Sequence, residues 1–525
     1  MTKRPNYILF ITDQHRADYL GCAGHPILKT PNIDSIASRG IQFDRFFVAS
    51  PICMPNRASL MTSRMPANHG VRMNGLPLAR QNVTFVEVLK AAGYKTALIG
   101  KSHLQTFSGK PPGYRMPPVR DGYDRPAGET QEAVRHDLSD PIYKTEDPAF
   151  WENPDAQTPT PFYGFDHVDL VTGHGDALGG NYKHWLRNRL PIAQDYMGAE
   201  NEIPHTYICP QAVRTAIPPE LYSTTYIAER AAAWIEEQGD DDTPFFLMVS
   251  WPDPHHPFNP PGKYWDMYDP DDMPVPEAFQ RNDWTPPPHV QGTLDLRAAG
   301  KAGLGGMMAV GTSNPREAQE AQALTCGMIS MIDDAVGTVQ SALRVTGLAE
   351  NTVEIFTSDH GDHLGDHKLL FKGAAAYDEI TRVPFIWADP NGPSGVTESR
   401  LGQTIDIGTT LLEHAKIEPS WGMQGLDLFG ARTRDVALIQ YAHQRPMDGI
   451  GVRPHVHTVH DGRYRLSLFE GLEWGELYDL QTDPGEFANL WSDDSKRDIK
   501  LRLMTQFAQA QMAHTDKAPL PTGHA

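Results

Sequence analysis

Cys53-Met54-Pro55-Asn56-Arg57, at residues 53–57, is the stretch that decides the fold and the chemistry of this chain. Pro55 favours the first turn of a helix, where its missing N–H costs no hydrogen bond. Cys53 then stands at the helix start, where free amides and the helix dipole favour negative charge. Arg57 lies about one turn further on and can face the same point. The pattern indicates either a reactive thiolate or a cysteine that becomes modified, with an inert buried cysteine as the alternative.

Strand and helix patterns alternate on both sides of this stretch. Short apolar runs predict buried strands, and amphipathic stretches between them predict helices. The expected strands of the larger part of the chain are 7–12, 41–48, 94–99, 244–250, 353–357 and 384–387. Besides the helix at Cys53, the expected helices are 32–39, 83–92, 220–238, 318–345 and 405–414. This order predicts an α/β fold, with a large, mainly parallel sheet flanked by helices on both faces.

Two long segments interrupt the alternation. Residues 104–218 and 252–313 are rich in proline and glycine and have little periodicity, so we expect irregular loops with a functional role. From about residue 430 the pattern changes to a helix at 495–512 preceded by short strands at 436–441, 456–460, 464–469 and 477–480. We therefore expect a large α/β domain at 1–430 and a smaller α+β C-terminal domain with a helical tail at 431–525.

The composition excludes several classes of function. The net charge of −20 argues against nucleic-acid binding, so an anionic ligand needs a locally positive pocket. The four cysteines are too scattered for a disulfide framework or a zinc knuckle, and we expect Cys22, Cys209 and Cys326 to be buried. No apolar run is long enough to span a membrane or to act as a secretory signal. We therefore expect a cytoplasmic protein that does not associate with membranes.

Polar side chains follow four of the expected strands at their carboxyl ends, where open parallel sheets bind ligands. Four of these side chains are oxygen and nitrogen donors that suit one divalent cation. They are Asp13 and Gln14 after the first strand, and Asp359 and His360 after the fifth. One alternative is a capping role for Asp13. Another is a solvated surface loop that includes the adjoining Asp362, His363, Asp366 and His367.

Four further basic side chains could form an anion site beside these donors, namely Lys101, His103, His255 and Lys372. Lys101 and His103 are two residues apart, so on an extended segment they point the same way. Two cationic donors aimed together suit a tetrahedral oxyanion. The alternatives are a surface lysine, a satisfied histidine at 103 and a turn histidine at 255.

Taken together, these motifs resemble the type I sulfatase family of the alkaline phosphatase superfamily. The similarity extends over nearly the whole chain. The matching stretches are 30–34, 53–57, 100–104, 356–361, 476–480, 483–486 and 489–490. The resemblance implies an alkaline-phosphatase-like fold. It also implies a formylglycine made by oxidation of Cys53, with a formylglycine-generating enzyme as the maturation partner.

Some positions depart from the family pattern. Gln14 stands where most sulfatases carry an acid, and His360 stands where they carry an asparagine; both resemble the phosphonate monoester hydrolase branch of the superfamily. Lys101 and His103 follow the sulfatases instead. Gln14 removes a negative charge beside the metal, so the pocket is expected to accept more negative substrates, including phosphoesters. His360 shifts the metal preference from calcium towards manganese. Asn56 replaces a usual small residue, which bears on the efficiency of cysteine conversion.

The resemblance also implies a mechanism. One divalent ion, calcium or manganese, is expected to bind Asp13, Gln14, Asp359, His360 and the oxidised Cys53. The hydrated formylglycine attacks sulfur while the metal, Lys101 and Lys372 stabilise the developing charge. His255 protonates the leaving oxygen, and Arg57 holds the hydrate. His103 or a metal-ligand carboxylate is the base for collapse of the sulfate ester. The expected enzyme is an arylsulfatase-type sulfuric ester hydrolase that also accepts phosphoesters and phosphonates.

Three other functions stay open. The same residues could serve a phosphonate monoester hydrolase or a phosphodiesterase. A binding protein or pseudoenzyme would keep Cys53 as a thiol and bind anions without hydrolysis. A catalytic thiolate at Cys53 would lose its activity on alkylation. In every enzymatic case the substrate is a small anionic ester, and the C-terminal helix is a candidate contact in a homo-oligomer.

Overall fold

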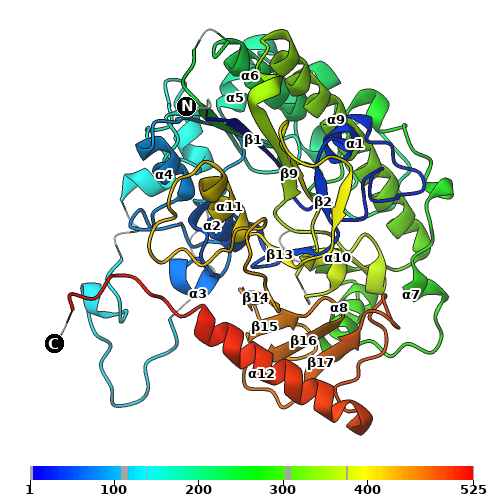
Figure 1. Cartoon of the computed structure of the whole chain (residues 1–525). Helices are drawn as coiled ribbons and strands as arrows, with labels where there is room; N and C mark the ends of the chain where they lie inside the picture. The colour runs from blue at the N-terminus through cyan, green and yellow to red at the C-terminus, as the bar shows by residue number, and fades with distance from the viewer. Residues whose placement is uncertain are drawn as a thin grey trace.

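A computed structural model describes residues 4–107 and 116–523, apart from 137, 139, 240, 302–308 and 374–375. Its centre is one large sheet (Figure 1). The strands of this sheet are β1 (Asn6–Thr12), β2 (Ile41–Phe43), β4 (Lys95–Gly100), β5 (His167–Thr172), β6 (Gly179–Gly180), β7 (Phe245–Ser250), β9 (Thr352–Ser358), β11 (Phe385–Ala388) and β12 (Val396–Glu398). They lie in the order β12-β2-β11-β9-β1-β7-β4-β5-β6. From β9 to β5 all neighbours are parallel, which confirms the predicted mainly parallel sheet.

Helices cover both faces of this sheet (Figure 1). One face carries α1 (Pro31–Ser38), α5 (Asn181–Arg189), α6 (Ser223–Glu236) and α9 (Pro315–Val345). The other carries α2 (Cys53–Thr62), α4 (Phe85–Ala91) and α11 (Asp406–His414). Alternation along β1 shows why both faces are apolar: Ile8 and Phe10 join the first core, and Leu9 joins the second.

The C-terminal part of the chain forms a second, smaller sheet. Its antiparallel strands follow in chain order as β14 (Ala437–Ala442), β15 (His455–His460), β16 (Tyr464–Phe469) and β17 (Gly475–Asp479). Helix α12 (Arg497–Ala513) packs on this sheet through Leu503 and Ala510, so the predicted α+β unit is confirmed. The boundary at residue 430 stays a prediction, because Leu438 of this sheet shares a core with Ala49 and Met65 of the larger part.

Segment 41–48 is not the single strand that its apolar run predicts. Strand β2 ends at Phe43, and the chain then leaves the large sheet. The next two residues of strand, β3 (Phe46–Phe47), pair with β13 (Gly402–Gln403) in a separate sheet. Asp44 and Arg45 interrupt the strand between them, which is why a run of apolar residues on both sides does not form one continuous strand.

The two segments predicted to be irregular contain regular elements. Segment 104–218 supplies β5, β6 and α5, and segment 252–313 supplies α7 (Glu277–Gln280), α8 (Pro288–Ala298) and β8 (Ala309–Gly311). Strand β8 pairs with β10 (Leu369–Phe371). Two more short helices are α3 (Pro66–His69) and α10 (Asp378–Thr381). These elements escaped the sequence prediction because proline and glycine lie within or near them; part of the glycine-rich run lies outside the described residues.

Two smaller predictions concern the cysteines and membrane spans. Cys209 and Cys326 are buried as predicted, whereas Cys22 is only half-buried against the core. Among the described residues, no helix combines the length and the apolar character needed to cross a membrane.

Candidate active site

Five adjacent parallel strands carry the candidate site at their carboxyl ends. Because the strands are parallel, these ends meet at one edge of the sheet. The polar residues that follow them are Asp13 and Gln14 (β1), Lys101 and His103 (β4), His174 (β5), His255 (β7), and Asp359 and His360 (β9). Helix α2 brings Cys53 to this edge, and the residue after β10 is Lys372.

Cys53 is the first residue of α2 and is almost completely buried. Its Sγ lies 2.9 Å from Lys372 Nζ, 3.1 Å from His360 Nε2 and 3.8 Å from Asp13 Oδ1. Burial raises the pKa of the Cys53 thiol to about 11, and the Asp13 carboxylate acts in the same direction. The side chain is therefore a protonated thiol at neutral pH, which argues against a thiolate nucleophile.

The predicted metal ligands lie close together. The ligand atoms of Asp13, Cys53, Asp359 and His360 are all within 4.8 Å of one another. Gln14 donates its backbone N–H to Asp359 Oδ1 (3.1 Å). This hydrogen bond holds the segment after β1 against the segment after β9. Its Nε2 donates to His256 Nδ1 (2.9 Å), while its buried Oε1 has no hydrogen-bond partner among the described residues.

Arg57 lies one turn along α2 and binds the carboxylates. Its Nε donates to Asp359 Oδ2 (2.7 Å), and its Nη2 is 3.7 Å from Asp13 Oδ2. Burial alone would lower the pKa of Arg57, but these two carboxylates raise it, so the guanidinium remains charged. Arg57 therefore balances charge and orients both aspartates.

Lys101 is a second cationic side chain, besides Arg57, that contacts Asp13. Its Nζ pairs with Asp13 Oδ2 and lies 2.6 Å from His174 Nε2. Burial would raise the pKa of Asp13, but Lys101, helped by His255 and other basic neighbours, holds it well below its usual value. Asp13 is therefore ionised and able to bind a cation.

His103 does not follow the predicted extended geometry. Its φ of 57° is left-handed, because the Glu146 carboxylate accepts the backbone N–H groups of His103, Leu104 and Gln105 and bends the chain. The His103 ring packs 3.9 Å from the Phe107 ring. The prediction that Lys101 and His103 point the same way from an extended segment is therefore wrong, although both remain beside the site.

His255 and Lys372 meet at the site from β7 and β10. Lys372 Nζ lies 2.7 Å from His255 Nε2. The His255 ring stacks on His174 with 3.6 Å between ring centres. Burial, together with His174 and Lys372, holds the pKa of His255 well below its usual value. A neutral imidazole thus faces a buried ammonium group.

Sequence reasoning missed two histidines of this site. His174 follows β5, which was hidden in the segment predicted to be irregular; the alternation of residues 167–172 was the available signal. His256 supports Gln14 and had no signal beyond its position next to His255. The alternative of a solvated surface loop after His360 does not hold, because Asp362, His363 and His367 are buried.

Comparison with known proteins identifies the family. Residues 5–417 match the family model described as Sulfatase. Residues 365–513 match the model of the N-sulphoglucosamine sulphohydrolase C-terminal region. The chain belongs to the sulfatase family. Its members generally use a metal ion and a formylglycine, which agrees with the resemblance seen in the sequence.

Individual relatives are similar over their whole length. The chain is 27% identical to the multifunctional alkaline phosphatase superfamily protein PehA of Trinickia caryophylli, covering 98% of this chain and 96% of the relative. It is 26% identical to an arylsulfatase of Clostridium perfringens, covering 99% and 98%. Among solved structures, a phosphonate monoester hydrolase of Agrobacterium radiobacter superposes with a TM-score of 0.75, at 25% identity and covering 98% and 97%.

The residues of this sulfatase site fit a divalent cation. Two carboxylates and one imidazole surround the thiol, and the unpartnered Oε1 of Gln14 adds a neutral oxygen donor. Oxygen donors with one nitrogen suit calcium or manganese. The pKa of His360 is lowered to about 4, first by burial and then by Lys372, so its imidazole is neutral and free to bind a metal.

Proposed function

We propose that this chain hydrolyses sulfate monoesters, as an enzyme of arylsulfatase type, with a formylglycine made from Cys53 and one calcium or manganese ion. The observation that carries the proposal is the contact of Cys53 with Asp13, His360 and Lys372 at the edge of five parallel strands. A family match over residues 5–417 and an arylsulfatase among the relatives support it.

The metal would be held by Asp13, Gln14, Asp359, His360 and the side chain at position 53. When bound, the cation polarises the oxygens it contacts, and formylglycine replaces the thiol by a carbon that carries hydroxyl groups. Arg57 keeps Asp359 and Asp13 in place through charge-assisted contacts at 2.7 and 3.7 Å.

Lys101 and Lys372 would bind the sulfate group. Both are buried, and they approach the site from different strands, β4 and β10. Two ammonium groups in a site shielded from water stabilise the charge that develops on the sulfate oxygens. Because Lys372 Nζ also touches Cys53 Sγ, it would hold the anion against position 53.

His255 would protonate the leaving oxygen once the negative charge of a bound ester has raised the pKa of its imidazole. Its Nε2 faces Lys372 Nζ at 2.7 Å, and its Nδ1 lies against the backbone carbonyl of His256. These contacts fix the ring, and the stacked His174 limits its rotation. Placement of an acid beside the leaving group is worth about 10²–10⁴ in rate.

Conversion of Cys53 by a formylglycine-generating enzyme would have to precede folding. The side chain is 1% exposed, and every residue of α2 is buried. A modifying enzyme needs an extended, accessible substrate, and the folded chain offers none here.

A second candidate activity is hydrolysis of phosphonate monoesters or phosphodiesters. Gln14 is neutral where an acid would add a negative charge, and the structure superposes on a phosphonate monoester hydrolase with a TM-score of 0.75. A more positive site favours more negative esters.

Peptide mass spectrometry across residues 50–64, combined with turnover of an aryl sulfate, an aryl phosphonate monoester and a phosphodiester, tests both candidates. We expect the Cys53 peptide to carry formylglycine and all three esters to be hydrolysed, the sulfate with the highest kcat/KM. Cys53→Ala should remove all three activities, whereas Cys22→Ser, outside the site, should keep them.

Two results would contradict the proposal. An active preparation with an unmodified Cys53 thiol would exclude the formylglycine route. A kcat/KM that is higher for the phosphonate or the phosphodiester than for the sulfate would make the second candidate the main activity.

A further inference from the structure

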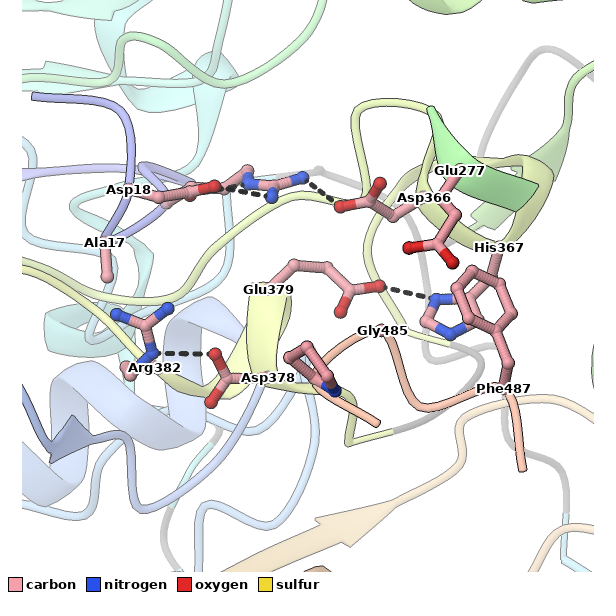
Figure 2. A pocket seen from close by; sticks show the side chains of 12 residues that line it. Ala17, Asp18, Glu277, Asp366, His367, Asp378, Glu379, Arg382, Gly485 and Phe487 are labelled. Atoms are coloured by element: carbon pink, nitrogen blue, oxygen red, sulfur yellow. Dashed lines mark hydrogen bonds and ion pairs between the residues drawn. The ribbon is translucent and has the colours of Figure 1, made fainter. Parts of the chain in front are cut away.

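A second group of metal-binding side chains lies outside the catalytic set. His363 and His367 belong to the loop between β9 and β10, and Glu379 belongs to α10. Nδ1 of His363 and Nδ1 of His367 are each 2.9 Å from Glu379 Oε1. The ligand atoms of the three residues lie within 4.8 Å of one another. Figure 2 shows the His367 ring and the Glu379 carboxylate turned towards each other at the side of a pocket.

The three side chains are buried. Their exposed fractions are 0% for His363, 2% for His367 and 8% for Glu379. The His367 ring is fixed by stacking on Tyr377, with 3.8 Å between ring centres and 14° between planes. Neither Nε2 of the two histidines has a hydrogen-bond partner in the described part of the chain. Glu379 is therefore the polar group on which both rings converge.

The surroundings of Glu379 are rich in negative charge. The adjoining cavity of about 180 Å³ is lined by the carboxylates of Asp18, Glu277, Asp366, Asp378 and Glu379, and by two guanidinium groups, those of Arg16 and Arg382. Arg16 pairs with Asp18 and Asp366, and Arg382 pairs with Asp378. In the described part of the chain, no arginine or lysine pairs with Glu379. The two histidine rings are therefore the groups that can balance the buried Glu379 carboxylate, either as a protonated imidazole or as ligands of a shared cation.

We propose that His363, His367 and Glu379 bind a second cation, a zinc-class transition metal, that is separate from the catalytic ion. Two imidazole nitrogens and one carboxylate oxygen form a set that zinc, cobalt and nickel prefer over calcium or magnesium. Ligands of a tetrahedral zinc ion lie about 3.3 Å apart, so the Nδ1–Oε1 pairs need to separate by only a few tenths of an ångström. The cavity that His367 and Glu379 line is large enough to hold a water as the fourth ligand.

This cation would hold the loop that leads to Lys372. His363 donates its backbone N–H to Phe371 O (2.8 Å), and Lys372 follows Phe371 directly. A metal that joins His363 and His367 to α10 therefore fixes both ends of the loop between Asp362 and Lys372. The ion would be structural, and its effect on the reaction would act through the position of Lys372.

The competing arrangement is a hydrogen-bonded charge cluster without metal. Burial alone would lower the pKa of His367, but the Glu379 carboxylate raises it to about 9, so a protonated ring could balance the charge. The two arrangements differ in metal content. The proposed site binds an ion, whereas the hydrogen-bonded ion pair binds none.

Metal analysis of the full-length protein tests the inference. The protein is stripped with a chelator, equilibrated with Zn²⁺ or with Co²⁺, separated from free metal and analysed by inductively coupled plasma mass spectrometry. We expect one ion at each of the two sites. Glu379→Gln, which keeps the shape and an acceptor oxygen, and His363→Ala should each lose one ion. Asp359→Asn should lose the other, and the exposed His455→Gln should lose neither.

The fluorescence of Trp284 reports metal binding without a substitution of any ligand. Its ring centre is 5.7 Å from that of His367, so bound Co²⁺ should quench its fluorescence. We expect Co²⁺ to quench a component of the wild-type emission that is missing in Trp284→Phe. An unchanged metal content in Glu379→Gln and His363→Ala, or no quenching of Trp284, would each overturn the inference.

Discussion

Asn56 joins two segments that hold the active site. Its Nδ2 donates to the backbone carbonyl of Asp359 (2.6 Å), and its Oδ1 accepts the backbone N–H of Ala49 (2.9 Å). The sequence marked Asn56 only as a departure from the family pattern. Its partner Asp359 is distant in the chain, so no local pattern could reveal that its amide ties the metal loop to α2.

Removing this amide should destabilise the protein. Asn56→Ala leaves a buried carbonyl and a buried N–H without partners, so we expect the free energy of unfolding to fall by about 2–4 kcal/mol. Urea denaturation of metal-loaded protein measures the change. Asn391→Ala, on an exposed loop, is the control and should change it little. A loss as small as that of the control would show that water replaces the amide.

Lys372 is the residue on which the proposed chemistry depends most. Lys372→Met keeps much of the side-chain volume but removes the charge next to position 53 and His255. We expect kcat/KM for aryl sulfate to fall by at least about 10²-fold, the effect of one lost donor to the developing charge. The exposed Lys263→Met is the matched control. Mass spectrometry of residues 50–64 must show equal conversion in both variants; equal activity would exclude a role for Lys372.

At the scale of elements, the sequence predicted four of the five strands whose ends form the site. Strands β1, β4, β7 and β9 are apolar runs, and their order made Asp13, Lys101, His255 and Asp359 neighbours at one edge. Strand β5 was missed because its six residues lie in a segment rich in proline and glycine. His174 was missed with it. The geometry of His103 was also beyond sequence reasoning, because it depends on distant Glu146.

The contact between β16 and α10 depends on a buried ionic network. Arg465 in β16 binds Glu486 and Glu476, donates to the latter at 2.9 Å, and packs over the rings of Tyr377 and Tyr478. Glu486 in turn accepts the backbone N–H of Asp378, the first residue of α10 (2.8 Å). The network therefore fastens the C-terminal sheet to the large domain.

Arg465→Met should expose this dependence. The substitution leaves two buried carboxylates without a cation, so we expect the free energy of unfolding to fall by about 3–5 kcal/mol. Arg463→Met removes the pair of a half-exposed arginine with Asp479 in the same strand region and leaves one carboxylate unpaired instead of two, so it should cost less. Chemical denaturation of both variants gives the comparison. Equal losses would mean that the fully buried network contributes no more than the pair of the half-exposed Arg463.

For the whole molecule, periodicity was sufficient to predict an α/β body followed by an α+β unit, but not how the two meet. The interface brings together residues that are far apart in the chain. The His460 ring of β15 lies 4.1 Å from the Phe47 ring of β3, and its Nδ1 accepts the backbone N–H of Gly462. Because these partners are some four hundred residues apart, their contact has no periodic signature in the sequence.

This interface should be sensitive to acid. Burial lowers the pKa of His460 from 6.5 to about 4, so between these values the unfolded chain binds a proton that the folded chain does not. The stabilisation that comes from the neutral His460 ring is complete above pH 6.5 and is lost as the pH falls from there towards about 4. From about pH 7 to about pH 5 the loss is about 2 kcal/mol.

His460→Gln keeps an acceptor for Gly462 but cannot titrate. We therefore expect the difference in free energy of unfolding between wild type and variant to shrink by that amount, as urea denaturation at the two pH values would measure. The exposed His455→Gln should show no such change, and a pH-independent difference for His460→Gln would mean that the folded protein protonates this ring freely.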